Sequence, residues 1–224
     1  MPILKPDKEY TGRATIRMYN CDCMELMKTG KKWDLAIVDP PYGIGVSRQE
    51  NSKRGKLGSH YKKAGWDDRP ASLEYFDLLF TISKNQIVWG ANHFISRIKK
   101  DSSCWLVWNK KTVGNTADCE LAWTSFDTAV RCYDYMWEGY WQEDMKNKQR
   151  RIHPTEKPIQ LYKWLLTNYA KEGDTIFDSH GGSMSIAIAC WEVGFDLDIC
   201  ELDKDYFDAA VKRFENHISQ QTLF

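Results

Sequence analysis

Residues 175–207 carry the clearest structural pattern in the chain and read TIFDSHGGSMSIAIACWEVGFDLDICELDKDYF. An apolar run ends at Asp178, a Gly-Gly turn follows, and an apolar helix is predicted to begin near Met184. A second apolar run ends in Glu201, about twenty residues after the first. This order is typical of nucleoside-cofactor sites, where glycines let the backbone approach the ligand and the acidic residue binds ribose hydroxyls. A plain β-α-β corner would show the same glycines, and the spacing of Glu201 favours the binding site.

The rest of the chain continues the alternation of short apolar runs and helical patterns, which predicts an α/β fold with a mostly parallel sheet. The expected strands are 15–19, 35–39, 86–90, 104–109, 175–178 and 195–200. Two further runs, 119–126 and 128–135, are separated by almost nothing and are predicted to form a hairpin. Helical spacing of apolar residues over 158–170 and 203–218 predicts two helices, the first with Pro158 at its first helical position.

Length and composition restrict the class of protein. With 224 residues the chain fits one domain, and 42% hydrophobic residues can fill a sizeable core. No stretch approaches the roughly 20 apolar residues of a membrane span, and the N-terminus lacks the apolar run of a signal peptide. We therefore expect a soluble, cytoplasmic protein without a membrane partner. The seven cysteines are odd in number and form no C-x-x-C pair, which predicts buried reduced thiols and no metal site.

Charge is balanced over the whole chain but uneven along it. The 31 basic and 31 acidic residues cancel, yet residues 43–66 carry a net charge of +5 and residues 145–157 a net charge of +4. Both segments coincide with stretches, 43–70 and 136–157, that fit no helix or strand. Solvated loops would explain the charge equally well, but the coincidence favours contact with a nucleic-acid backbone. The expected nucleic-acid-binding residues are Arg48, Lys53, Arg54, Lys56, Lys62, Lys63, Lys146, Lys148, Arg150 and Arg151.

The residues Asp39-Pro40-Pro41-Tyr42 directly follow the apolar run LAIV and suit one demanding reaction. Methylation of an aromatic amine is difficult because the nitrogen lone pair is delocalised into the ring. Acceptors for the two N–H bonds free that lone pair, and the Asp39 carboxylate and the Pro40 carbonyl are placed to supply them from a backbone held rigid by two prolines. Tyr42 would offer a ring on which a base rotated out of a duplex stacks. An ordinary strand followed by a Pro-Pro turn is the alternative.

A third block, His153-Pro154-Thr155-Glu156-Lys157-Pro158, precedes the expected helix and by itself indicates only a loop. The order D-P-P-Y, then H-P-T-E-K-P, then the glycine turn with E-L-D resembles the beta group of amino DNA methyltransferases. The resemblance runs from about Tyr19 to His217. It implies a Rossmann-like S-adenosylmethionine-dependent methyltransferase fold with a seven-stranded mixed sheet and one antiparallel hairpin. It also implies a single domain over 1–224, with a catalytic half at about 15–135, a short basic insert at 136–152 and a cofactor half at 153–218.

By the same resemblance, the chain methylates the N6 amine of adenine in DNA with S-adenosylmethionine as methyl donor. The implied catalytic residues are Asp39, Pro40, Pro41 and Tyr42. The implied cofactor-binding residues are Asp22, Cys23, Asp39, Lys157, Asp178, His180, Gly181, Gly182, Ser183, Glu201 and Leu202. Adenine is expected because cytosine enzymes of this group tend to carry Ser in place of Asp39. Methylation of cytosine N4, methylation of adenine in RNA, and a non-catalytic DNA-binding relative stay open as alternatives.

The resemblance also extends to partners and contains departures. Besides DNA, it allows a homodimer and a companion restriction endonuclease in a prokaryotic cell or a phage-infected host. The glycine turn of the family usually reads D-P-F-x-G-S-G, whereas residues 178–184 read DSHGGSM. We expect His180 to pack on the cofactor, and the loss of the last glycine at Met184 to tighten the turn and change cofactor affinity rather than the reaction. Because the segment before H-P-T-E-K-P is short, base reading is expected to fall to 43–70 or to a partner subunit, or to be relaxed.

Overall fold

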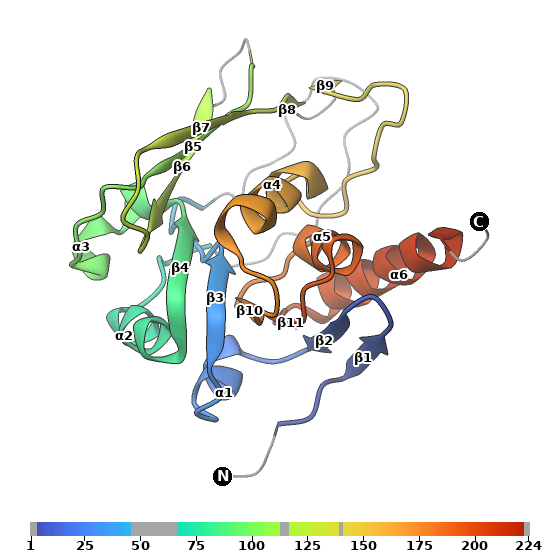
Figure 1. Cartoon of the computed structure of the whole chain (residues 1–224), viewed down its shortest axis with the longest axis horizontal. Helices are drawn as coiled ribbons and strands as arrows, with labels where there is room; N and C mark the ends of the chain where they lie inside the picture. The colour runs from blue at the N-terminus through green and yellow to red at the C-terminus, as the bar shows by residue number, and fades with distance from the viewer. Residues whose placement is uncertain (1–3, 46–66, 113–116, 139–140, 222–224) are drawn as a thin grey trace.

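The computed structural model describes residues 4–45, 67–112, 117–138 and 141–221, which form one large sheet between two layers of helices (Figure 1). Among these residues the sheet has nine strands in the order β1-β2-β11-β10-β3-β4-β6-β5-β7. Their bounds are β1 Lys8–Thr11, β2 Thr15–Tyr19, β3 Trp33–Val38, β4 Ser83–Trp89, β5 Leu106–Asn109, β6 Cys119–Thr124, β7 Arg131–Asp134, β10 Ile176–Asp178 and β11 Leu197–Cys200. A separate ribbon pairs β8 (Trp137–Glu138) with β9 (Trp141–Gln142).

The middle of the sheet is parallel, as the alternation of apolar runs and helical patterns predicts. Strands β2, β11, β10, β3 and β4 each run parallel to the next. The six expected single strands are confirmed, although several ends shift by up to three residues. The expected fold class is confirmed as well. The sheet has nine strands instead of seven because β1 and β7 are added as its two outermost strands.

The predicted hairpin between 119–126 and 128–135 is wrong. Strand β6 pairs antiparallel with both β4 and β5, whereas β7 lies on the far side of β5 and runs parallel to it. Burial explains this order, because Ala122, Trp123 and Thr124 of β6 are almost fully buried and need a neighbour on each side. Strand β7 is largely exposed and suits an edge. The antiparallel hairpin of the fold is therefore the pair β5–β6.

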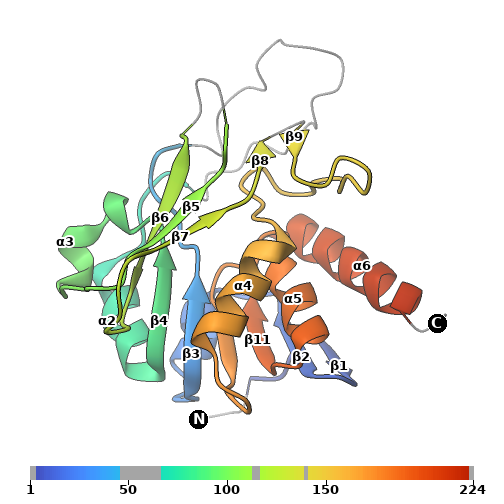
Figure 2. The same ribbon diagram turned by 45° about the horizontal axis from the view of Figure 1, so that its top comes forward.

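Helices cover both faces of the sheet (Figures 1 and 2). One layer contains α1 (Cys23–Met27), α2 (Leu73–Ile82) and α3 (Ile95–Ile98), and the other contains α4 (Ile159–Tyr169), α5 (Ser185–Val193) and α6 (Lys204–Gln221). Strand β3 shows the alternation that supports this arrangement, since Leu35 and Ile37 pack with α4–α6 while Ala36 and Val38 pack with α1–α3. Pro158 precedes α4 in an extended conformation, so it is the N-cap and not the first helical residue. Within the described ranges no helix is long and apolar enough to cross a membrane.

The parallel strands bring three acidic residues to one edge of the sheet. Asp39 follows β3, Asp178 ends β10 and Glu201 follows β11, and these three strands are neighbours in the order β11-β10-β3. Ligands of open parallel sheets bind beyond the carboxyl ends of the strands. We therefore expect the ligand-binding site at this edge.

Candidate active site

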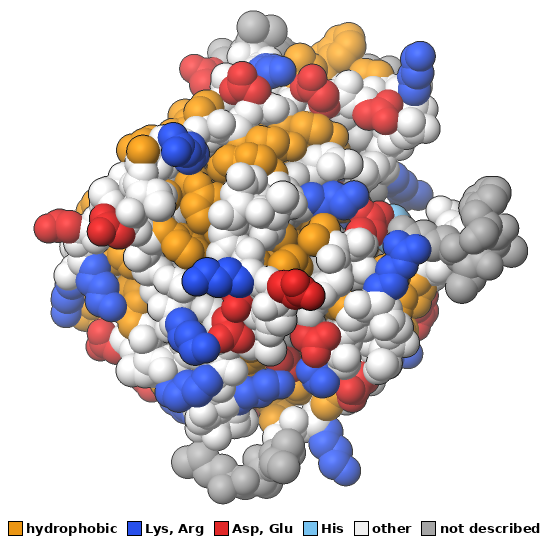
Figure 3. All heavy atoms as spheres, viewed as in Figure 1, with side chains coloured by type: hydrophobic (Ala, Val, Ile, Leu, Met, Phe, Trp, Pro, Cys, Tyr) orange, Lys and Arg blue, Asp and Glu red, His pale blue; other side chains and the backbone are white. Residues whose placement is uncertain are grey.

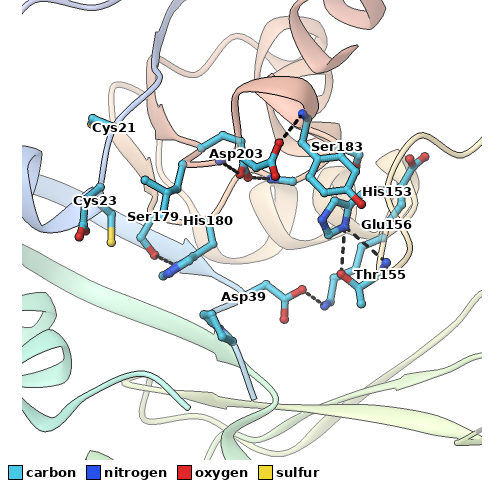
Figure 4. Close-up of a pocket in the computed structure, with 18 of the residues that line it drawn as sticks. Cys21, Cys23, Asp39, His153, Thr155, Glu156, Ser179, His180, Ser183 and Asp203 are labelled. Atoms are coloured by element: carbon cyan, nitrogen blue, oxygen red, sulfur yellow. Dashed lines mark hydrogen bonds and ion pairs between the residues drawn. The ribbon is translucent and has the colours of Figure 1, made fainter. Parts of the chain in front are cut away.

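A pocket of about 570 Å³ lies at this edge of the sheet (Figure 4). Its wall comes from residues at the ends of β3, β10 and β11, from the start of α1, from segment 153–157 and from α6. Ligand sites of about 300–1,000 Å³ bury most of a drug-sized molecule. A nucleoside cofactor therefore fits the volume.

Most of the residues that the resemblance assigned to the site share this wall. They are Asp22, Cys23, Asp39, Pro41, Lys157, His180, Gly181, Gly182, Ser183, Glu201 and Leu202. Within the described part of the chain, Pro40, Tyr42 and Asp178 do not line the pocket; Tyr42 bonds to Asp39, and Asp178 accepts the His180 N–H at 3.0 Å. The wall also contains residues that the sequence analysis did not select: Cys21, His153, Thr155, Glu156, Tyr162, Ser179, Asp203 and Tyr206. His153, Thr155 and Glu156 belong to the H-P-T-E-K-P block, so its position beside Lys157 was an available signal.

The glycine turn packs directly against the end of β11. The Gly181 N–H donates to the Cys200 carbonyl at 2.7 Å. A Cβ at Gly181 would come within 3.0 Å of the Ile199 side chain. Gly182 has a φ of +52°, in the left-handed region that glycine adopts without strain. The two glycines therefore let the backbone itself form this part of the pocket wall.

Met184 occupies the position of the family's last glycine. It has a φ of +52°, and its side chain is buried at the start of α5. A left-handed conformation costs a residue with a Cβ about 1–2 kcal/mol. The turn thus holds a conformation that glycine would adopt freely, and burial of the Met184 side chain in the core offsets the strain.

Ser179 and His180 form a hydrogen-bonded unit where the family has Pro and Phe. The Ser179 hydroxyl lies 2.8 Å from His180 Nδ1 and 2.7 Å from the Tyr75 hydroxyl. The rings of His180 and Tyr75 meet edge-on, with centroids 5.5 Å apart. Burial lowers the pKa of His180 to about 4, so this ring is neutral at physiological pH. A neutral planar ring fixed in the wall can pack against an apolar part of a ligand (Figure 4).

Two carboxyl groups of the site change charge in the neutral pH range. The Glu201 carboxylate accepts the Gly182 N–H at 2.7 Å on one oxygen and the Asp203 N–H at 2.8 Å on the other. Each oxygen has a second acceptor position for a ligand hydroxyl. Burial raises the pKa of Glu201 to about 7, and burial also raises the pKa of Asp178 to about 7.

Both oxygens of the Asp39 carboxylate are engaged. Oδ1 accepts a hydrogen bond from the Tyr42 hydroxyl at 2.5 Å, and Oδ2 accepts one from the Lys157 ammonium group. The Asp39 side chain is 17% exposed and lines the pocket. One face of the Tyr42 ring stacks on His93 with centroids 5.0 Å apart. A target base would therefore need the opposite face or a rotated Tyr42.

Lys157 connects Asp39 to Glu120, a residue that the sequence analysis missed. Lys157 Nζ lies 3.1 Å from Glu120 Oε2, and Lys110 Nζ lies 2.5 Å from Glu120 Oε1. The Lys157 side chain is only 2% exposed, and its ammonium group lies 5.5 Å from the centre of the Trp89 ring. Burial lowers the pKa of Lys157, but the Asp39 and Glu120 carboxylates raise it by more. The net effect is a pKa above the ordinary value, so the ammonium group stays charged. Glu120 lies inside an apolar strand without a motif, which left no local signal for its role.

The residues predicted to bind nucleic acid fall into two groups. Those of the first segment lie outside the described residues: Arg48, Lys53, Arg54, Lys56, Lys62 and Lys63. Lys146 is exposed. Lys148, Arg150 and Arg151 line an open groove together with three further basic residues of α4 and α6: Lys163, Lys212 and Arg213. Arg213 links this groove to the pocket, because it donates to the Ser183 carbonyl at 2.9 Å and pairs with Glu156 at 3.2 Å. On the face shown in Figure 3, basic and acidic side chains are interspersed.

Comparison with known proteins identifies the family of this site. The N6/N4 methyltransferase family model, described as DNA methylase, matches residues 96–212, more than half of the chain. The chain belongs to the DNA methylase family. The family expected from the three motifs is thereby confirmed.

Individual relatives of the methylase differ in how much of the chain they match. The Type II methyltransferase M.HpaI of Haemophilus parainfluenzae is 32% identical over 76 residues, which cover 33% of this chain and only 23% of that protein. The putative methylase YubD of Escherichia coli (strain K12) is 24% identical over 220 residues, which cover 88% of this chain and 89% of YubD. The crystal structure of the M1.HpyAVI–SAM complex has a TM-score of 0.57 at 21% identity and covers 88% of this chain and 99% of that one. At this identity the structural likeness establishes the fold of the methylase alone.

Proposed function

We propose that the methylase transfers a methyl group from S-adenosylmethionine to the N6 amine of adenine in DNA. The observation that carries this proposal is the position of the Asp39 carboxylate. It follows β3 and lines a nucleoside-sized pocket whose wall also contains the glycine turn and Glu201 (Figure 4). An aspartate at the first position of the motif favours adenine over cytosine, since cytosine enzymes that resemble this chain tend to carry Ser there.

The wall of the pocket fits S-adenosylmethionine chemically. Glu201 has acceptor positions for ribose hydroxyls, because its two backbone hydrogen bonds use only one position on each oxygen. The turn at Gly181 and Gly182 lets the backbone approach the ligand, and the neutral His180 ring offers an apolar contact. When bound, the cofactor supplies an electrophilic methyl group on a sulfonium.

Asp39 then has the role of an acceptor for the target amine. One N–H of the amine replaces the Tyr42 hydroxyl on Oδ1, while Lys157 keeps Oδ2. Polarisation of this N–H bond directs the nitrogen lone pair away from the ring, and fixed positioning supplies much of the rate. The amine becomes acidic as the new bond forms, so its proton leaves late through Asp39 or water. The Tyr42 ring, released from Asp39, stacks on the rotated base.

DNA is the proposed partner, with its backbone held by the two basic segments. Lys148, Arg150 and Arg151 lie together on the groove beside α4 and α6, which supports phosphate contacts there. We also expect a homodimer, a companion restriction endonuclease and a cytoplasmic location.

Nucleoside analysis tests the reaction directly. The wild-type protein is incubated with labelled S-adenosylmethionine and either unmethylated genomic DNA or RNA, and the labelled nucleoside is then identified. N6-methyladenine from DNA is the expected product. Label in N4-methylcytosine or in RNA adenine would redirect the proposal to those substrates, and absence of both methylation and cofactor binding would overturn it.

Asp39→Ala separates catalysis from binding. The variant should keep the fold but lose about 100-fold or more in single-turnover methyl transfer at saturating cofactor, as when one preorganised polar group is removed from a reacting centre. Asp77→Ala, which removes an exposed aspartate of α2, is the matched control and should retain the rate. Near wild-type transfer by Asp39→Ala would contradict the mechanism.

A further inference from the structure

Four charged side chains form a continuous series of contacts behind the pocket. Lys110 contacts Glu120 at 2.5 Å, Glu120 contacts Lys157 at 3.1 Å, and Lys157 contacts Asp39. The β5–β6 hairpin supplies Lys110 and Glu120, whereas Asp39 follows β3 and Lys157 precedes α4. Only Asp39 and Lys157 line the pocket, so the other two groups act on it from behind the wall.

The buried ammonium group of Lys157 creates an electrostatic problem for the proposed cofactor. A sulfonium is a cation, so a bound sulfonium would be repelled by this ammonium group. For any two like unit charges about 8 Å apart at an effective dielectric constant of about 20–40, the repulsion corresponds to a change in affinity of about 5- to 30-fold. Asp39 offsets one unit of this positive charge through its Oδ2 atom. A second carboxylate, that of Glu120, contacts the same ammonium group from behind the wall.

The contacts also show why Glu120 is charged. Burial raises the pKa of Glu120, but the Lys157 and Lys110 ammonium groups lower it by more, so the net pKa lies below the ordinary value. The four groups Lys110, Glu120, Lys157 and Asp39 therefore carry two positive and two negative charges and are neutral as a set. Loss of Glu120 alone would leave the set at +1, and loss of Lys110 alone would leave it at −1.

We infer that Glu120 is a positioning residue that holds Lys157 on Asp39, and that its negative charge, balanced by Lys110, keeps the set of four groups neutral so that the pocket accepts a sulfonium. The inference rests on the proposed function, since it concerns the charge of the proposed methyl donor. A purely structural role of Glu120 would not change the preference of the pocket between a cationic and a neutral ligand. Substitutions of opposite charge at Glu120 and Lys110 should change the preference for a cationic ligand in opposite directions.

The test compares S-adenosylmethionine with S-adenosylhomocysteine, which lacks the methyl group and the sulfonium charge. Dissociation constants for both ligands are measured by calorimetry on folded protein. In Glu120→Gln, affinity for the sulfonium ligand relative to the neutral ligand should fall about 5- to 30-fold, and Glu120→Asp should restore most of it. In Lys110→Gln, the relative affinity should rise about 2- to 5-fold, because Lys110 reaches Lys157 only through Glu120.

Glu172→Gln is the matched control for the loss of one negative charge. Glu172 is exposed in the turn between α4 and β10, at the opposite edge of the sheet from the pocket, and its replacement should leave the ligand ratio unchanged. Equal loss of both ligands in the Glu120 and Lys110 variants would overturn the inference in favour of a purely structural role. An unchanged ratio would overturn it as well.

Two outcomes separate this inference from the proposed function. If wild-type protein binds neither ligand, the proposed function fails. If wild-type protein binds both and the ratio does not respond to charge, only the role of Glu120 fails. Circular dichroism shows whether Glu120→Gln folds; if it does not, Lys110→Gln decides, and a ratio that falls or stays constant in that variant would overturn the inference.

Discussion

Replacement of Gly90 by alanine should damage methyl transfer through Tyr42 while leaving the cofactor pocket intact. Gly90 follows β4 with a φ of +68°, and a Cβ at this position would lie 2.0 Å from Cε1 of Tyr42. The ring would have to move by more than about 1 Å to reach ordinary van der Waals contact. That movement conflicts with the hydrogen bond of the Tyr42 hydroxyl to Asp39 at 2.5 Å and with the stacking on His93.

The size of the effect follows from two separable terms. An alanine with positive φ costs about 1–2 kcal/mol of unfolding free energy. Overpacking against the Tyr42 ring adds about 1–3 kcal/mol. Gly30→Ala is the matched control, because Gly30 has a φ of +84° and a Cβ there would meet nothing within 4 Å. Gly90→Ala should therefore lose about 2–5 kcal/mol and Gly30→Ala only about 1–2 kcal/mol.

Three measurements check the prediction. Urea unfolding gives the two stabilities, calorimetry gives cofactor affinity, and single-turnover transfer at saturating DNA gives the rate. Gly90→Ala should lose about 10- to 100-fold in rate, the equivalent of one lost base-stacking contact, with cofactor affinity unchanged. Equal stability and equal rate in the two alanine variants would refute the reasoning, because Tyr42 would then not be confined by Gly90.

Three further experiments address other parts of the site. Tyr42→Phe removes the hydroxyl that occupies Asp39 but keeps the ring, so its single-turnover rate should stay within about 3-fold of wild type. Tyr42→Ala also removes the ring and should lose about 10- to 100-fold in rate. Equal losses in the two variants would contradict the stacking role. Because burial raises the pKa values of Glu201 and Asp178 to about 7, both lose their charge as pH falls through 7, and calorimetric cofactor affinity should weaken from pH 8 to pH 6. Glu201→Gln should reduce this pH dependence, and a flat wild-type profile would argue against ionised acceptors. Arg150→Ala should flatten the log–log dependence of DNA affinity on salt by about one unit, while a lysine substitution at the opposite sheet edge should not.

The sequence predicted the parts of the fold that depend on local pattern. The strands β3, β10 and β11, which end at or one residue before Asp39, Asp178 and Glu201, are short apolar runs followed by turn residues. Their existence and their shared edge follow from period and topology rules. The neighbour of each antiparallel strand depends instead on tertiary burial. Strand β6 enters the interior of the sheet because Ala122 and Trp123 are buried, and no residue between 119 and 135 encodes that choice locally.

Helix α2 was missed although the sequence contained its signals. Ser72 caps it by accepting the Tyr75 N–H at 3.1 Å, and its buried residues Tyr75, Phe76, Leu79 and Ile82 follow helical spacing. Helix α1 has only five residues, too few for a periodic pattern, and its cap is Asp22. Asp22 therefore combines a structural role with a place in the pocket wall, a combination that a motif alone cannot distinguish.

The two buried acids of the site, Glu201 and Asp178, should ionise more readily when a cationic ligand is present. Glu201 and Asp178 have pKa values raised to about 7, which means that their charged forms are destabilised by burial in the ligand-free protein. The Lys157 ammonium group, which lines the pocket, is already held by Asp39 and Glu120. The proposed methyl donor carries two positive groups, an ammonium and a sulfonium, and a cation in the pocket would lower the pKa of both acids. We therefore expect the site to bind the charged donor more tightly above pH 7 than its neutral product, and the calorimetric comparison of the two ligands at pH 6 and pH 8 tests this expectation.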